Sequence, residues 1–118
     1  MSIMAVAIPI KPGKTGAWRE WTDELKGPRQ REYASSRNRV GLRERSFLQQ
    51  SPQGDLVIVT LEGDDPERAF AKMMQASDPF TSWFLDQVKE IHGIDLANGE
   101  MAVPTLMVDS EAALVAAG

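Results

Sequence analysis

Residues 42–63, LRERSFLQQSPQGDLVIVTLEG, predict a β-hairpin on which the rest of the fold depends. The turn at 51–54, SPQG, has a proline that fixes φ at its second position and a glycine that accepts the positive φ closing it. The strand at 56–61 is apolar on both alternating sides, which is typical of a central strand buried on two faces. Charged side chains between 43 and 49 mark the other strand as an edge strand.

The first strand of the chain has the same character as the second strand of the hairpin. Residues 3–10, IMAVAIPI, place large side chains on one face and small alanines on the other. Both faces are apolar, so we expect this strand to be central as well.

The segment between this strand and the hairpin predicts a broken helix. Its apolar stripe has the spacing i, i+3, i+7 and consists of Trp18, Trp21 and Leu25. Thr15 is the expected N-cap of this helix. Gly27-Pro28 interrupts the helical hydrogen bonding, and a second segment runs from Pro28 to Arg39.

Two cap-then-proline pairs predict a second broken helix after the hairpin. Asp65-Pro66 and Asp78-Pro79 each place a capping carboxylate before a first-turn proline. The apolar stripe of the later segment consists of Phe80, Trp83, Phe84, Val88 and Ile91. Residues 101–108 predict a last strand, which Pro104 confines to an edge, and residues 110–117 predict a short helix.

The predicted order β-α-β-β-α-β is that of an α+β, ferredoxin-like sandwich. We expect a single domain over residues 1–118, with a core at about 3–109 and the sheet order 4-1-3-2. This order places strands one and three in the middle, where their two apolar faces require cover on both sides. The helices cover one face, so we expect a second copy to cover the other and form a homodimer through the sheet faces.

Composition limits the class of protein. The chain has 118 residues, a net charge of −4, no cysteine and one histidine. Its longest apolar runs fall far short of the roughly 20 residues that a membrane helix needs. Residues 1–10 lack the basic start and the cleavage site of a secretory signal. We therefore expect a cytoplasmic protein with no membrane partner, no metal site and no cofactor.

Basic residues are concentrated in one segment. Residues 26–45 hold seven Lys and Arg against two acidic residues, a local charge of +5. The acidic remainder and the lack of RNA-binding aromatic motifs argue against a nucleic-acid partner. Two interpretations stay open, a solvated helix face paired with acidic residues and a pocket for an anionic small molecule.

Several local motifs are similar to a small bacterial branch, of uncharacterised function, of the dimeric α+β barrel superfamily. They are Lys11-Pro12-Gly13-Lys14, the Trp18, Trp21 and Leu25 stripe, Phe47-Leu48, Leu61-Glu62-Gly63-Asp64-Asp65-Pro66 and Ser77-Asp78. The resemblance covers about residues 3–109. It implies a homodimeric barrel that binds a small, partly apolar molecule, with cofactor-free monooxygenase or isomerase chemistry. The alternative is a non-catalytic structural or binding dimer whose barrel is filled by its own side chains.

Haem-degrading members of the superfamily are similar in having a histidine on the second helical region, a nearby tryptophan and an asparagine on the first strand. Trp83 and His92 match two of these positions. The asparagine is missing from residues 4–8, so haem degradation is not expected.

His92 is the first candidate for catalysis, because it is the side chain whose ordinary pKa lies near neutrality. Its alternative role is structural, as a cap on the last carbonyls of its helix. Tyr33 and Trp83 are candidate ligand-binding residues, with core packing as the alternative for both. Arg43 and Arg45 point the same way as Phe47 on an edge strand, where they either hold an anionic oxygen or pair with acids at the interface.

Overall fold

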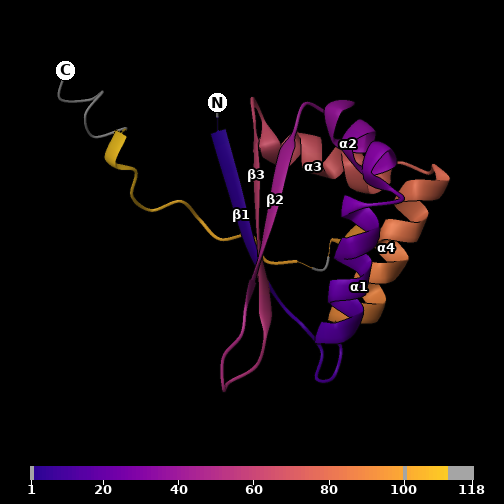
Figure 1. Ribbon diagram of the computed structural model, residues 1–118. Helices are drawn as coiled ribbons and strands as arrows, with labels where there is room; N and C mark the ends of the chain where they lie inside the picture. Colours follow the sequence, from indigo (N-terminus) through magenta and orange to yellow (C-terminus); the bar gives the residue numbers. More distant parts are fainter. Residues whose placement is uncertain (1, 100, 112–118) are drawn as a thin grey trace.

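The computed structural model describes residues 2–99 and 101–111. Its elements are β1 (Ser2–Pro9), α1 (Thr15–Lys26), α2 (Gln30–Asn38), β2 (Arg43–Gln49), β3 (Leu56–Gly63), α3 (Pro66–Gln75), α4 (Pro79–His92) and the 3₁₀ turn η1 (Leu96–Asn98). The strands form one antiparallel sheet in the order β1-β3-β2, and the helices lie on one side of it (Figure 1). The α+β class and the central position of β3 are therefore confirmed. Within the described residues, no helix is long and apolar enough to cross a membrane.

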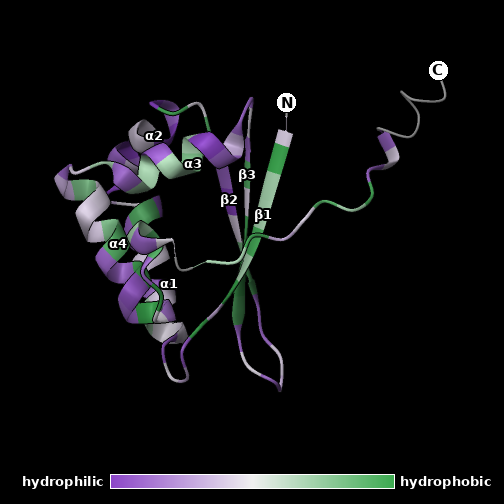
Figure 2. Ribbon diagram, turned by 180° about the vertical axis from the view of Figure 1, so that it is seen from behind, coloured by the Kyte–Doolittle hydropathy of each residue, from purple (hydrophilic) through white to green (hydrophobic). Residues whose placement is uncertain are grey.

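The alternation of side chains along the strands decides which face of the sheet is covered. In β1, Met4, Val6 and Ile8 are buried against the helices, whereas Ala7 on the opposite face is exposed. In β3, Leu61 is fully buried on the helix side. The sheet thus has a helix-covered face and a second face, which we call the open face. Figure 2 shows β1 and β3 as predominantly apolar strands.

The predicted hairpin turn is confirmed. The Gly54 amide donates to the Ser51 carbonyl at 3.0 Å, and Gly54 has φ +125°. The Ser51 hydroxyl also donates to the carbonyl of Gly54 at 2.9 Å. Pro52 and Gly54 therefore fix the register in which β2 and β3 pair.

The two cap-then-proline helix starts are also confirmed. Asp65 accepts a hydrogen bond from the Arg68 amide at 3.2 Å, and Asp78 accepts one from the Thr81 amide at 3.1 Å. Thr15 does not cap α1, because the N-cap is Lys14. The Thr15 hydroxyl instead donates to Asp55 at 2.6 Å, which ties the start of α1 to the hairpin.

The predicted last strand at 101–108 is wrong, and with it the fourth strand of the order 4-1-3-2. The first strand was expected to be central, but without a fourth strand beside it β1 is an edge strand of the described sheet. Residues 101–109 form neither helix nor strand, and they leave the body on the side of the open face (Figure 1). Pro104 has no amide hydrogen to donate and interrupts any ladder through the middle of this run. Residues 110 and 111 are helical, and the rest of the predicted terminal helix lies outside the described residues.

Replacing Asp78 with alanine should lower the free energy of unfolding by about 1 kcal/mol at pH 7, because two hydrogen bonds to Thr81 are lost. The side-chain bond from Thr81 is the main reason that the pKa of Asp78 lies below its ordinary value. A carboxylate with a lowered folded-state pKa stabilises the protein above its unfolded-state pKa, and this contribution is lost as the pH falls through the folded-state value. The difference between wild type and Asp78→Ala should therefore shrink below about pH 4.

Urea denaturation followed by circular dichroism measures this difference. Asp86→Ala is the matched control, since it removes a carboxylate from an exposed position on the same helix. Equal stabilities of Asp78→Ala and wild type at pH 7 would contradict the capping role.

Candidate functional site

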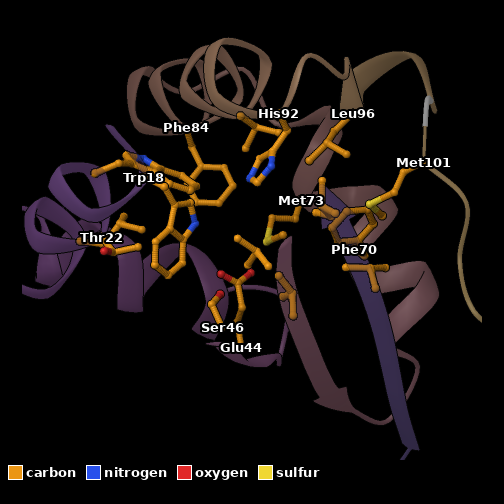
Figure 3. Close-up of a pocket in the computed structure, with 17 residues that line it drawn as sticks. Trp18, Thr22, Glu44, Ser46, Phe70, Met73, Phe84, His92, Leu96 and Met101 are labelled. Carbon is orange, nitrogen blue, oxygen red and sulfur yellow. The ribbon is translucent and has the colours of Figure 1, made fainter. Parts of the chain in front are cut away.

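A mostly apolar cavity lies between the helix-covered face of the sheet and the helices. Its volume is about 50 Å³, and its walls come from the sheet, from α1, α3 and α4, and from the segment after α4. Its polar side chains are Thr22, Glu44, Ser46 and His92 (Figure 3). The volume is several times the roughly 10–15 Å³ that one water molecule requires, and well below the roughly 300 Å³ of a small drug site. The cavity as it stands therefore suits a molecule of only a few non-hydrogen atoms.

His92 reaches this cavity from the last turn of α4. Its Nδ1 lies 2.9 Å from the carbonyl oxygen of Pro9 in β1. A carbonyl oxygen can only accept, so Nδ1 carries the proton and Nε2 of the neutral ring has a free lone pair. The imidazole thus joins α4 to β1 rather than capping the carbonyls of its own helix.

The environment of His92 favours the neutral ring. Burial lowers the pKa of His92 below its ordinary value of 6.5, and the hydrogen bond to the Pro9 carbonyl opposes this shift only in part. His92 is 9% exposed, and the imidazole points toward the cavity in Figure 3. At neutral pH the site therefore offers an uncharged nitrogen base with an oriented ring.

A buried ion pair forms another part of the cavity wall. Glu44 projects from β2 and meets Arg37 of α2 at 3.1 Å, and their side chains are only 7% and 6% exposed. The Tyr33 hydroxyl donates to the same carboxylate at 2.5 Å. Burial and the Glu44 charge raise the pKa of Tyr33 well above its ordinary value. Glu44 thus accepts hydrogen bonds from a cationic donor, Arg37, and from a neutral donor, Tyr33.

Aromatic rings support this ion pair. The Arg37 guanidinium lies 4.8 Å from the ring centroid of Tyr33 and 4.5 Å from that of Phe84. Its Nη1 donates to the Ser36 hydroxyl at 2.8 Å. The guanidinium of Arg37 therefore has partners on several sides, and these contacts fix its orientation toward Glu44.

A surface groove lies next to the cavity, beside the edge strand. The groove has a volume of about 370 Å³ and shares four lining residues with the cavity: Trp18, Thr22, Leu25 and Ser46. Ser46 is exposed although its side chain belongs to the helix-facing set of β2. The groove between α1 and β2 therefore adjoins the cavity, and the shared side chains form the boundary between the two.

The predicted site residues separate into two groups. His92 lines the cavity, and Tyr33 lines the adjoining groove and bonds to a cavity residue. Trp83 does not line the cavity. Its ring packs against Trp21 and Phe80, and the Arg29 guanidinium lies 4.1 Å from its centroid.

Arg43 and Arg45 also lie away from the cavity, on the open face of the sheet. Arg45 pairs there with Glu62 on the neighbouring strand. Other basic residues of the segment 26–45 pair with acids as well, among them Arg37 with Glu44 and Arg29 with Glu24. The Arg29 pair agrees with the interpretation of a solvated helix face paired with acidic residues, whereas the Arg37 pair is buried.

Glu44 and Arg37 were missed as site residues. Their signal was present in the spacing, because Glu44 alternates with Leu48 on one face of the strand, opposite Arg43 and Phe47. Arg37 follows Tyr33 by four residues and thus shares its helix face. An ionisable residue on an inward face is a stronger indication of a site than an arginine on an outward one.

Comparison with known proteins gives a fold-level relationship. No protein-family profile matches the chain, and no curated protein matches it in sequence. Among solved structures, the chain is similar to the crystal structure of an L-rhamnose mutarotase from Formosa agariphila, with 12% identity and a TM-score of 0.58. The match covers 92% of this chain and 97% of that one. At this identity the similarity establishes a shared small α+β fold.

Proposed function

We propose that this protein binds a small, mainly apolar molecule in the helix–sheet cavity and moves a proton on it, as isomerases do. The observation that carries the proposal is the free lone pair of His92 Nε2, inferred from the 2.9 Å hydrogen bond between Nδ1 and Pro9, on a ring directed at the cavity. The fold shared with a mutarotase, an isomerase by its name, supports the same class of reaction.

The lining of the cavity favours a ligand with few polar groups. A sugar carries several hydroxyls, and each one buried without a partner costs about 1–3 kcal/mol. The cavity offers four polar side chains and the unpaired indole N–H of Trp21, and both oxygens of Glu44 already accept hydrogen bonds. A compact carbonyl compound with an acidic C–H bond fits this lining better than a sugar.

One base is sufficient for such a reaction. His92 Nε2 accepts a proton from a carbon next to the carbonyl, the C–H electrons form a carbon–carbon double bond, and the carbonyl electrons move to oxygen. The imidazolium then returns the proton to another atom of the same molecule, so no atom or electron is gained or lost. Burial lowers the pKa of His92, which favours return of the proton. Monooxygenase chemistry stays a prediction from the family resemblance.

The binding step is tested by a thermal-shift screen with small ketones, aldehydes and their hydrocarbon analogues. A molecule that binds the folded state should raise Tm by mass action. Ser46→Trp places a large ring at a residue that lines both the cavity and the groove, and it should abolish the shift. Ser35→Trp, at an exposed position of α2, is the control and should keep it. A filled, non-catalytic interior predicts no shift with any compound.

The catalytic step is tested with His92→Asn. The asparagine amide can replace Nδ1 as donor to Pro9, but the variant has no nitrogen base at the position of Nε2. Deuterium incorporation from D₂O into a bound carbonyl compound, followed by NMR, should fall by about 10² to 10⁴-fold while ligand affinity is kept. His92→Gln is the complementary variant, since it loses the bond to Pro9 and should be the less stable of the two. Wild-type exchange in His92→Asn would overturn the assignment of the base.

The same residue predicts a pH dependence of stability. The folded-state pKa of His92 is lowered, so the unfolded chain binds more protons near pH 6 and stability falls as the pH drops from about 7 through the folded-state pKa. His92 is the sole histidine, so this decline should be missing from His92→Asn. Urea denaturation of both proteins between pH 5 and pH 8 measures it. Parallel curves would contradict a buried neutral His92.

We further propose that the protein is a homodimer through the open face of the sheet. The open face carries Phe47, which is 52% exposed, and Ile3, which is 48% exposed. Ile58 lies between Phe47 and Ala7 in the register of the sheet, so an apolar row crosses this face. A second copy presenting the same row would cover it.

A further inference from the structure

Exposed apolar side chains of this protein are found in two places. Among the described residues, the large hydrophobic side chains classed as exposed are Ile3, Phe47, Val103, Leu106, Met107 and Val108. The first two lie on the open face, and the other four lie on residues 101–109, which we call the C-terminal arm. Leu106, Met107 and Val108 are 64%, 82% and 84% exposed, which is unusual for a run of such side chains.

The arm and the open face lie on the same side of the molecule. Figures 1 and 2 show, from opposite directions, that the arm runs outward on the side of the sheet that has no helices. A partner seated on the open face would therefore lie beside the arm. Both surfaces belong to the same chain. In a dimer with two-fold symmetry, the open face and the arm of each copy would therefore both be buried in the interface.

The open face by itself is small for a stable interface. Three strands at about 4.8 Å spacing and eight residues at about 3.3 Å rise give roughly 370 Å² of planar area. Specific interfaces bury about 800 Å² on each partner. An extended apolar arm that packs on the partner would add buried apolar surface to the interface and so make up the area that the open face alone does not provide.

We propose that the C-terminal arm of each copy packs against a second copy of the chain, so that two arms are exchanged across the dimer. This inference rests on the proposed homodimer and adds the arm as the element that holds it.

The exchange also connects the partner to the cavity. The arm begins at Met101, which lines the cavity together with Phe70 and Leu96 (Figure 3). A partner that holds residues 106–108 fixes the position of Met101 at the end of the cavity. Dimer formation and the shape of the ligand site are therefore coupled through the arm.

Charged substitutions in the full chain separate the arm from the sheet face. Leu106→Asp with Met107→Asp should raise the dimer dissociation constant by at least about 100-fold, because both side chains are lost from two arms. Sedimentation velocity at micromolar concentration should then find the 13.0 kDa monomer in place of a species of twice that mass. The control carries Ala71→Asp with Gln75→Asp on exposed positions of α3 and should remain dimeric.

Each result has one meaning. A dimeric arm variant would overturn arm exchange while leaving a sheet-face dimer intact, and a monomeric wild type would overturn both. Unchanged circular dichroism of the arm variant verifies its fold, since both substituted side chains are exposed. The ligand screen with wild type is scored separately, so loss of arm exchange and loss of the proposed activity are distinguishable.

Cross-linking provides a second measurement, which does not require a variant with a weakened dimer. The chain has no cysteine, so Leu106→Cys and Phe47→Cys each introduce a unique thiol. A mixture of the two variants should form a mixed disulfide on mild oxidation, in higher yield than a mixture of Leu106→Cys with Ala71→Cys. Equal yields in the two mixtures would show that the arm does not reach the open face of a partner.

Discussion

The sheet carries apolar side chains on both faces, but the helices of the chain cover one of them. This constraint determines the positions of the other parts. Large side chains of β1 and β3 face the helices, and the smaller alanines of β1 face outward, so the core forms on one side only. The hydrophobic effect then drives helix packing on that side and leaves the opposite side as a surface that a partner can bury.

The candidate site is a consequence of the same layered packing. Within the described residues, α1 to α4 pack on the sheet formed by β1, β3 and β2, and the cavity lies between these layers with a surface groove beside it. Polar groups enter this space from separate elements, Glu44 from the sheet and His92 from α4. Each is fixed by a contact outside its own element, His92 by Pro9 of β1 and Glu44 by Arg37 of α2. The bond between His92 and Pro9 joins a helix to a strand, so the orientation of the imidazole is set by two regular elements and not by a loop.

Local sequence signals predicted most of the fold. The Pro52–Gly54 turn and the Asp65-Pro66 and Asp78-Pro79 starts depend on interactions within a few residues, so they could be inferred directly. The run at 101–108 has an apolar composition typical of a strand, but strand formation depends on a pairing partner elsewhere in the fold. Composition alone could not identify one. The same reasoning explains Thr15, whose hydroxyl is used by Asp55, forty residues away in the sequence.

Side-chain partners were harder to predict than elements. His92 was identified by its chemistry, because a single imidazole stands out in the sequence, but its bond to Pro9 spans 83 residues and has no local signal. Arg43 and Arg45 were predicted correctly to share a face of the strand with Phe47. The helices pack on the opposite face of the sheet, and the cavity lies under them, so the two arginines lie away from the cavity. The resemblance implies a ligand inside the barrel of a dimer, whereas the described apolar cavity of the chain lies between the sheet and the helices.

The protonation state of His92 is the central claim of this account, and ¹⁵N NMR of the sole imidazole tests it most directly. At pH 7 we expect a neutral ring with the proton on Nδ1, an unprotonated Nε2, and a pKa below 6.5. The Nε2 resonance should shift when a cavity ligand is added. A ring protonated at Nε2, or one still charged at pH 7, would contradict the account.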